Sequence, residues 1–438
     1  MRAKTEGKIT LAQAVAMAVG TMIGASIFSL LGVGAQLAGS NLPLSFVLSG
    51  ILALMVAYSY AILGRHIVSN AGPIAFILRG FGDSFIVGVL AILMWMSYVI
   101  SIALFAKGFA GYLLPLLGIA PTKAANLAVI TALLAVFTAL NATGGSQLVG
   151  RLEFSMVLIK IGILVLFVLA GLVTLKPERL IPQWDPAHIR GMLNAALLFF
   201  LSYMGFGLVT NASENMEDPE RNVPRAIYLS ILIVMVIYVS VAAVAVGNLT
   251  VEQLAEAKEN ALAIAAQPAL GRLGFTLVSV GALISITSAL NATLYGGANV
   301  AYAFARDGLL PETFERKRWF EAPEGLYLTA GLGWLFAVGF RIESVASFIS
   351  LIFTAIYLAV LLSHWRLVPQ YGGDRRLLAI NITALSATFV GLVVYQWRQS
   401  AKDFGSFVLM LALVVLVEVW YRYRRQRHLR LPARALRS

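Results

Sequence analysis

Long apolar runs separated by short polar connections make up almost the whole chain. Each run is close to the roughly 20 residues that a transmembrane α-helix needs, and about twelve can be counted. Mean hydropathy is +0.84 and only 12% of the residues are charged, which excludes a soluble multidomain protein. The pattern predicts an all-α membrane protein with about 12 transmembrane helices, near residues 10–37, 43–64, 83–115, 122–142, 147–175, 189–213, 222–247, 270–306, 325–340, 342–364, 377–397 and 403–421.

The basic residues indicate how these helices are oriented. Roughly two thirds of the 33 Lys and Arg residues fall on the even-numbered connections and at the two ends, so we expect both termini to be cytoplasmic. The net charge of +12 and the basic tail at 422–438 are explained better by topology and contact with anionic lipid than by nucleic-acid binding. No removable signal peptide is expected. We expect a multi-pass protein of the cell (plasma) membrane.

Cysteine and histidine usage narrows the chemistry. The chain has no cysteine, which excludes disulfides, iron–sulfur clusters and a thiol nucleophile. Its four histidines are far apart, so no metal site is expected, and the runs hold no paired-carboxylate or Ser/His/Asp arrangement that would indicate an enzyme. No linker divides the chain, and we expect a single domain over 1–438. Residues 250–267 are expected to form an amphipathic helix on the outer membrane face.

Small residues interrupt the first run at its centre. Gly20 and Gly24 are followed by Ala25 and Ser26, which give a helix little reason to stay wound there. A broken helix at membrane depth leaves backbone N–H and C=O groups without partners. A ligand can satisfy them, with an anionic group at the freed amides and an ammonium or a cation at the freed carbonyls. The alternative is that the glycines only let another helix pack closely.

The sixth run repeats this feature. Gly205 and Gly207 lie in its middle, and the chain becomes polar by Asn211, earlier than in a simple span. Two interrupted spans, the first and the sixth, are typical of inverted-repeat transporters that bind substrate near the membrane midplane. The coincidence favours the binding interpretation of Gly20 and Gly24 over the packing one.

A lysine lies at the centre of the fifth run. Lys160 is too deep to reach either surface easily, and a charge there costs at least about 2.5–3.5 kcal/mol on insertion scales. Burial favours the neutral amine, so this group is suited to taking up and releasing a proton. The alternative is a permanently charged lysine that acts as a fixed strut. Lys107 is nearer to a span end and is expected to reach the surface, and Glu418 is expected to be structural.

Three stretches resemble motifs of one known family. Residues 20–28 (GTMIGASIF), 214–227 (ENMEDPERNVPRAI) and 305–311 (ARDGLLP) are similar, in the same order, to a first-helix motif and two cytoplasmic loops of the amino acid–polyamine–organocation (APC) superfamily. The resemblance covers essentially the whole chain and is closest to proton-coupled, sodium-independent, broad-specificity members. It implies a LeuT-type 5+5 inverted repeat with helices 1 and 6 unwound at mid-membrane. The repeats would lie at about 10–175 and 189–364, followed by extra helices at about 377–421.

The resemblance also implies a substrate site at the two interruptions. Amides after the break in helix 1 would bind the carboxylate of an amino acid, and carbonyls at both interruptions would bind its ammonium. A gate on helix 6 would cover the substrate, although several members have an aromatic residue in place of Leu201. The implied residues are Ala25, Ser26 and Ile27 for the carboxylate, Ile23, Gly24 and Gly205 at the breaks, and Phe200, Leu201 and Tyr203 for the gate.

By the same resemblance, Lys160 matches a helix-5 lysine whose amine takes the place of a sodium ion in sodium-coupled relatives. Its implied neighbours are the carbonyls of Gly20 and Ile23 and the hydroxyl of Ser285, with Ser288 nearby. A protonated amine would hold these groups. Loss of the proton would release them and let helix 1 move against helix 5.

Gly207 bears on the substrate, because many members have Asp or Glu at that position and this chain has no acidic residue at either break. A cationic substrate would bury an unpaired charge, so neutral L-amino acids of broad range are expected. We predict a secondary active transporter that imports amino acids by proton symport and alternating access, without sodium and with no cofactor besides the proton. The alternatives are an amino acid exchanger, a Na⁺-coupled symporter and a membrane amino acid sensor.

Overall fold

The structure is a computed structural model that describes residues 9–69, 72–143, 146–306, 310–317, 320 and 322–425. Apart from two isolated backbone bridges, the regular structure in these ranges is helical, which confirms the all-α prediction. Most of the predicted basic tail at 422–438 and part of the motif at 305–311 lie outside the described residues.

The helices follow the order of the predicted spans, with short helices in the connections. The α-helices are α1 (Leu11–Met22), α2 (Ala25–Ser29), α3 (Leu31–Ala38), α4 (Leu42–His66), α5 (Pro73–Phe81), α6 (Phe85–Leu116), α7 (Lys123–Ala142), α8 (Ser146–Gly171), α9 (Pro186–Phe199), α10 (Leu208–Asn211), α11 (Pro219–Asn248), α12 (Val251–Glu256), α13 (Ala261–Ala265), α14 (Gln267–Arg306), α15 (Glu324–Gly339), α16 (Ile342–Tyr371), α17 (Arg375–Gln399) and α18 (Ala401–Arg425). The 3-10 segments are η1 (Gly39–Asn41), η2 (Pro177–Leu180), η3 (Phe200–Gly207), η4 (Ser213–Asn215), η5 (Lys258–Asn260) and η6 (Glu312–Phe314).

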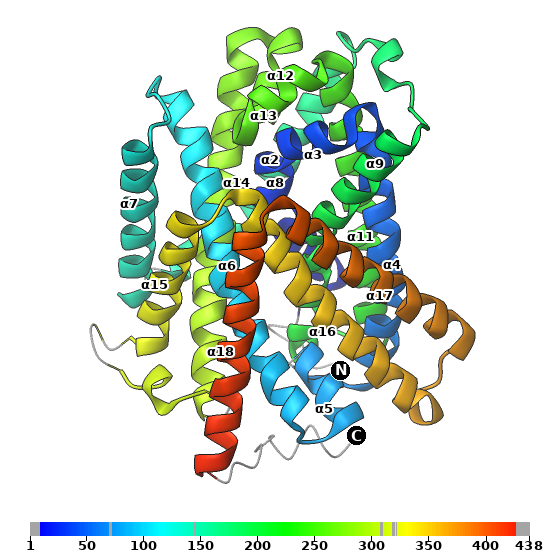
Figure 1. Ribbon diagram of the computed structural model, residues 1–438, viewed down its shortest axis with the longest axis vertical. Helices are drawn as coiled ribbons and strands as arrows, with labels where there is room; N and C mark the ends of the chain where they lie inside the picture. The colour runs from blue at the N-terminus through cyan, green and yellow to red at the C-terminus, as the bar shows by residue number, and fades with distance from the viewer. Residues whose placement is uncertain are drawn as a thin grey trace, which may run out of the picture.

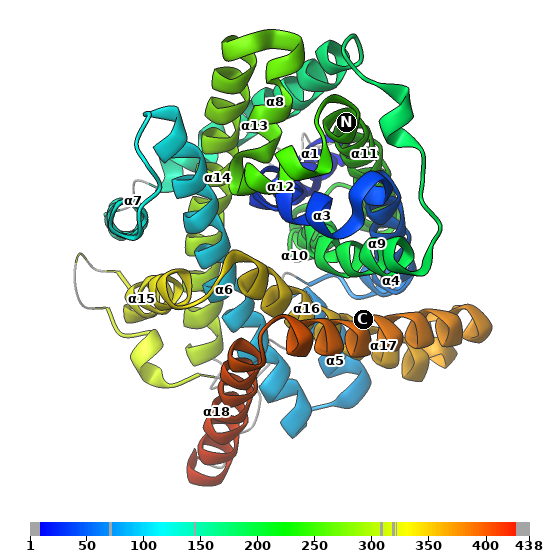
Figure 2. The ribbon, with the colours of Figure 1, turned by 45° about the horizontal axis from the view of Figure 1, so that its top comes forward.

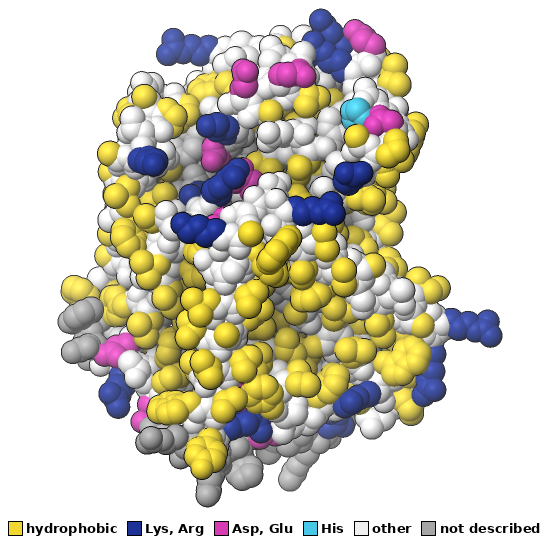
Figure 3. Space-filling model, in the orientation of Figure 1, with side chains coloured by type: hydrophobic (Ala, Val, Ile, Leu, Met, Phe, Trp, Pro, Cys, Tyr) yellow, Lys and Arg dark blue, Asp and Glu magenta, His cyan; other side chains and the backbone are white. Residues whose placement is uncertain are grey.

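Ten helical segments within the described ranges are long and apolar enough to cross a membrane. Two of them, Leu11–Ser29 and Pro186–Thr210, are the interrupted first and sixth spans. The two other predicted spans appear as α8, with 26 residues, and α15, with 16 residues. Figure 3 shows apolar side chains over the middle of one face and charged side chains towards its two ends. This distribution suits a protein whose middle is surrounded by lipid.

Polar caps fix where several helices begin. Thr10 and Thr250 each form a capping box with the glutamine three residues later, before α1 and α12. Asp185 caps α9 without a capping box: its carboxylate accepts hydrogen bonds from amides in the first turn of the helix. Hydrogen bonds from the side chain and the amide of His188 lower the pKa of the Asp185 carboxyl.

The single amphipathic helix predicted for 250–267 is not observed. The segment forms α12, η5 and α13, because Lys258 has a φ of 50°, which an α-helix cannot accommodate. Figure 1 shows α12 and α13 together at the end of the molecule opposite to α5. Figure 2 shows α12 lying against α3, which it contacts. These short helices therefore cover one end of the first span.

The two interrupted spans lie at the centre of the helical packing. α1 packs against α11, η3 and α8, and every residue of α2 is buried. The small residues of the first span allow this, because they let neighbouring backbones come close. The division of the chain into two inverted repeats stays a prediction.

The chain just before α1 pairs with the loop after α10. The amide of Ile9 donates to the carbonyl of Asn215 at 2.8 Å, and the amide of Glu217 donates to the carbonyl of Ile9 at 3.0 Å. These bonds form an isolated bridge between Ile9 and Met216. The beginning of the first span and the end of the sixth therefore lie side by side.

Candidate functional site

The first span is broken where the sequence predicts. α1 ends at Met22 and α2 begins at Ala25. Between them, the backbone of Ile23 (φ −78°, ψ 66°) and Gly24 (φ −100°, ψ −138°) lies outside the helical region. The amide of Gly24 donates to the carbonyl of Met22 at 2.8 Å. The predicted break in helix 1 is confirmed.

Side chains from other helices satisfy the carbonyls at this break. The hydroxyl of Ser285 on α14 donates to the carbonyl of Ile23 at 2.8 Å, and the hydroxyl of Tyr238 on α11 donates to the carbonyl of Met22. Such partners are needed because an unpaired buried polar group costs about 1–3 kcal/mol. The two carbonyls are thereby held by α14 and α11.

The amides at the start of α2 need hydrogen-bond acceptors, whereas the carbonyls at the break need donors. The first amides of a helix have no intrahelical acceptor, so those of Ala25, Ser26 and Ile27 are available to an anionic group. Gly24, Ala25 and Ser26 line a cavity, whereas the side chains of Ile23 and Ile27 are fully buried and are not among the residues that line it. The structure thus places the start of α2 beside a space that a ligand can occupy.

The sixth span is interrupted at the predicted place, but it is not unwound. Residues Phe200–Gly207 form the 3-10 helix η3, whose hydrogen bonds link residues three apart. Three hydroxyls reach its carbonyls: Tyr238 to Ser202 at 3.4 Å, Tyr357 to Met204 at 3.2 Å and Thr210 to Gly207 at 2.7 Å. This difference from the predicted unwound segment has a physical reason. A 3-10 helix whose carbonyls also accept side-chain hydrogen bonds leaves fewer buried backbone groups without a partner than an unwound segment would.

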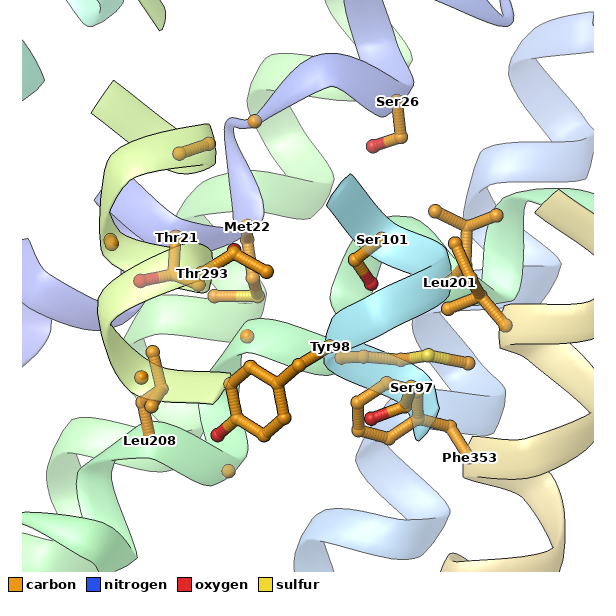
Figure 4. A pocket seen from close by; sticks show the side chains of 18 of the residues that line it. Thr21, Met22, Ser26, Ser97, Tyr98, Ser101, Leu201, Leu208, Thr293 and Phe353 are labelled. Atoms are coloured by element: carbon orange, nitrogen blue, oxygen red, sulfur yellow. The ribbon is translucent and has the colours of Figure 1, made fainter. Parts of the chain in front are cut away.

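The cavity has a volume of about 330 Å³ and lies between the two interruptions. Residues of α4, α5, α6, α14 and α16 complete its walls. Figure 4 shows Ser26 and Thr21 on opposite sides of the break in the first span, and Ser101 on α6 also lines the cavity. None of the described residues that line the cavity carries a charge. Its recognition groups are therefore backbone atoms, hydroxyls and apolar side chains.

The cavity is open at one end and closed at the other. Met17, which is 40% exposed, and Thr21 on α1 line it towards the beginning of the first span. At the other end the hydroxyl of Tyr112 donates to the carbonyl of Phe28 in buried α2 at 2.7 Å. A Cβ on Gly32 would lie 2.6 Å from the carbonyl oxygen of Lys258 in η5 and 2.7 Å from that of Leu254 in α12. α3 is therefore packed tightly against these segments at this end.

Gly20 and Gly24 have different roles. A Cβ on Gly20 would overlap the side chain of Val157, so this glycine is needed for close packing of α1 against α8. A Cβ on Gly24 would have its nearest neighbours at 3.4–3.7 Å, which are ordinary contact distances. The packing interpretation holds for Gly20, whereas Gly24 lies at the break itself.

The close approach at Gly20 brings Lys160 to the first span. Lys160 on α8 is 1% exposed, and its amine donates to the carbonyl of Gly20. The hydroxyl of Ser285 donates to the carbonyl of Ile23, three residues further along the first span. Ser288 is buried and lines the cavity. The structure thus joins Lys160 of α8 to Gly20, and Ser285 of α14 to Ile23, whereas a direct contact of Lys160 with Ile23 or Ser285 stays a prediction.

The three residues predicted for the gate differ in their position relative to the cavity. Phe200 and Tyr203 are fully buried and are not among the residues that line the cavity, and the hydroxyl of Tyr203 donates to the carbonyl of Phe46 at 2.9 Å. Leu201 does line the cavity, as does Gly205, and Figure 4 shows Leu201 on the same side as Phe353.

α6, α11 and α16 contribute residues to the site that the sequence does not predict. Ser97, Tyr98 and Ser101 on α6 line the cavity. The two serines are four residues apart in an otherwise apolar span, a spacing that places both on one helix face and could have been noticed. Tyr238 and Tyr357 carried no such signal, because a tyrosine in an apolar run is usually a core residue.

Two other charged residues lie away from the cavity lining. Glu418 is fully buried and accepts a hydrogen bond at 3.0 Å from Arg422, which also binds Asp83 at 2.7 Å, so these residues join α18 to the start of α6. Lys107 is partly buried, and the carboxylate of Glu259 interacts with its charge.

Comparison with known proteins finds relatives over nearly the whole chain. The family described as amino acid permease matches residues 9–419. The chain is 56% identical over 416 residues to an uncharacterized protein of Methanocaldococcus jannaschii, covering 95% of each chain. It is 30% identical to the inner membrane transport protein YbaT of Escherichia coli, over 92% of this chain and 95% of the relative. It is 29% identical to the branched-chain amino acid permease BcaP of Bacillus subtilis, over 68% of this chain and 67% of the relative.

Proposed function

The chain belongs to the amino acid permease family, and from this premise we propose that it imports neutral L-amino acids together with protons. It is a multi-pass membrane transporter and not an enzyme. In the proposal, transport is secondary active and proceeds by alternating access, with broad specificity among neutral amino acids. It requires no sodium and no cofactor besides the coupling proton.

The observation that carries this proposal is the cavity at the two interrupted spans, whose described lining residues carry no charge. Every α-amino acid has a carboxylate and an ammonium, which the amides at the start of α2 and the carbonyls of the breaks would bind. The side chain of the substrate would meet only hydroxyls and apolar groups of the described lining. A second positive charge would be buried without a partner, which disfavours arginine, lysine and polyamines. The relative named a branched-chain amino acid permease supports this substrate class.

The proton is assigned to Lys160. A buried ammonium is tolerated only while acceptors surround it, and the carbonyl of Gly20 is one of them. When α1 moves and withdraws that carbonyl, the amine loses its proton more easily. Proton binding and the position of α1 are therefore linked, and each changes the other by the same factor.

The proposed orientation places both termini in the cytoplasm of a cell whose plasma membrane holds the protein. The excess of Lys and Arg on that side supports it. The cavity then opens to the cytoplasm along α1, since Met17 and Thr21 lie at its open end. In this state a substrate is released inward, while α12 and α13 cover the outer side.

Uptake into sealed proteoliposomes tests this proposal. With an inward proton gradient and no sodium, the purified protein should accumulate radiolabelled L-leucine or L-alanine above the external concentration. Several neutral L-amino acids should displace one another. Accumulation that needs sodium, or uptake only into vesicles preloaded with amino acid, would indicate one of the other coupling modes. Binding without transport in every condition would indicate a sensor, and strong preference for arginine or agmatine would contradict the substrate class.

A further inference from the structure

Tyr357 on α16 contacts the 3-10 segment η3 along its length. Its hydroxyl donates to the carbonyl of Met204 at 3.2 Å. Its ring lies edge-on to Phe200 at 5.9 Å and stacks on Phe206 at 5.7 Å between ring centroids. Tyr357 is 1% exposed, so these contacts are made in the protein interior. This one side chain of α16 therefore reaches the beginning, the middle and the end of η3.

A 3-10 helix of this length needs support from outside. Such helices rarely exceed about 3–4 residues, because their hydrogen bonds are poorer than those of an α-helix, whereas η3 has 8 residues. It is flanked by α9 and α10, so continuing the α-helix would be the local default. Two tyrosines supply hydroxyls to its carbonyls, Tyr238 from α11 and Tyr357 from α16, and of these Tyr357 lines the cavity.

The form of η3 decides which of its residues face the cavity. A 3-10 helix turns about 120° per residue and rises about 2.0 Å, whereas an α-helix turns about 100° and rises about 1.5 Å. A change of form would shorten the 8-residue segment by about 4 Å. It would also change the angle between the faces of Leu201 and Gly205 by about 80°. Both residues line the cavity now, and an α-helical η3 would aim them differently.

We propose that Tyr357 is a positioning residue, which holds η3 in the 3-10 form and so aims Leu201, Met204 and Gly205 at the substrate. The inference rests on the proposed function, because it requires an amino acid in this cavity. The hydroxyl of Tyr357 acts through the carbonyl of Met204, and its ring acts through Phe200 and Phe206. α16 thereby sets the shape of the sixth span at η3, at the depth of the substrate.

The test is Tyr357→Phe, assayed in proteoliposomes with radiolabelled L-leucine and L-alanine. This substitution removes the hydroxyl and keeps the ring that contacts Phe200 and Phe206. We expect KM to rise about 2- to 13-fold, the range for one hydrogen bond, and the rate at saturating substrate to stay within about twofold. A role only in global stability would instead lower the melting temperature and the amount of active protein and leave KM unchanged.

Tyr395→Phe is the matched control. Tyr395 on α17 is buried, its hydroxyl accepts a hydrogen bond from Gln399 at 3.1 Å, and it is not among the residues that line the cavity. This variant should keep the KM of the original protein. Equal KM values for Tyr357→Phe and the original protein would overturn the positioning role. The absence of any L-leucine or L-alanine transport by the original protein would overturn the proposed function instead.

A second substitution separates positioning from direct contact with the substrate. Phe206 stacks on Tyr357, is fully buried and is not among the residues that line the cavity. If Tyr357 acts through η3, Phe206→Leu alone raises KM, and the double variant shows less than the product of the two single effects. An unchanged KM for Phe206→Leu would contradict the proposal, and this variant also decides the question if Tyr357→Phe does not fold.

Discussion

The hydroxyl of Tyr238 on α11 lies between carbonyls of the two interrupted spans. It donates to the carbonyl of Met22 at the break in the first span, and the carbonyl of Ser202 in η3 is 3.4 Å from the same oxygen. Tyr238 is fully buried, so bulk water cannot take the place of its hydroxyl. A single side chain of α11 thereby joins the two halves of the candidate substrate site.

Tyr238→Phe should destabilise the protein and weaken substrate binding together. The substitution removes one of two hydrogen bonds to the carbonyl of Met22, which keeps the bond from the Gly24 amide, and one such bond contributes about 0.5–1.5 kcal/mol. We expect a lower melting temperature of the purified protein and a higher Kd for L-leucine in equilibrium binding. If neither quantity differs from that of the control variant Tyr395→Phe, the two carbonyls have other donors and the link is not needed.

Lys160→Ala should abolish accumulation driven by a proton gradient and preserve substrate binding. The amine of Lys160 donates to the carbonyl of Gly20, and Lys160 is not among the residues that line the cavity. Removing this side chain therefore leaves in place the groups that would bind the carboxylate and the ammonium of the substrate. Lys160→Arg should also fail to accumulate substrate, because arginine keeps its proton. The measurement is uptake of L-leucine into proteoliposomes with an imposed pH gradient, with binding measured separately. Accumulation by Lys160→Ala at the level of the original protein would show that the lysine is a strut.

Gly24→Leu should abolish substrate binding in a protein that still folds and inserts. A Cβ at this position has room, with Phe105 and Ala289 at 3.6 and 3.7 Å, but the rest of a leucine would extend into the cavity. Gly24→Ala is the matched control and should retain most of the binding. Size-exclusion chromatography checks folding, and equilibrium binding of L-leucine gives the result. Retained binding by Gly24→Leu would favour a substrate site elsewhere.

Gly207→Asp should extend recognition to cationic amino acids. Gly207 lines the cavity, and a Cβ there would have Tyr60 as its nearest neighbour at 3.6 Å, which is an ordinary contact distance. A carboxylate there would supply the counter-charge that the described lining lacks. Competition by L-arginine against radiolabelled L-leucine should improve at least about tenfold, equal to about 1.4 kcal/mol, relative to the neutral variant Gly207→Asn. Equal competition in the two variants would mean that the substrate side chain does not face η3.

The break in the first span and the surroundings of Lys160 could be predicted because they depend on local chemistry. Small residues weaken a helix wherever they stand, and a charge in the middle of an apolar span must find polar neighbours. The different roles of Gly20 and Gly24 could not be predicted, because they depend on Val157 of another helix. The same limit applies to the amphipathic segment, where the break at Lys258 has no strong sequence signal.

The form of the sixth span could not be predicted for a related reason. Gly205 and Gly207 indicate that the α-helix is weak there, but the 3-10 form depends on hydroxyls that arrive from α11 and α16. Tyrosines in apolar spans do not reveal their partners, since the same residue type fills an ordinary core. The gate prediction failed to separate Leu201 from Phe200 and Tyr203, because a change in the turn per residue redistributes side chains around the helix axis.

The backbone bridge between Ile9 and the loop after α10 couples the movements of two segments that are far apart in sequence. Its two hydrogen bonds, at 2.8 and 3.0 Å, join the chain just before α1 to Asn215 and Glu217. A swing of α1 at this end must carry that loop along or break both bonds. The chain has no cysteine, so a disulfide introduced at Ile9 and Met216 would be the sole crosslink and would report directly on which of the two occurs.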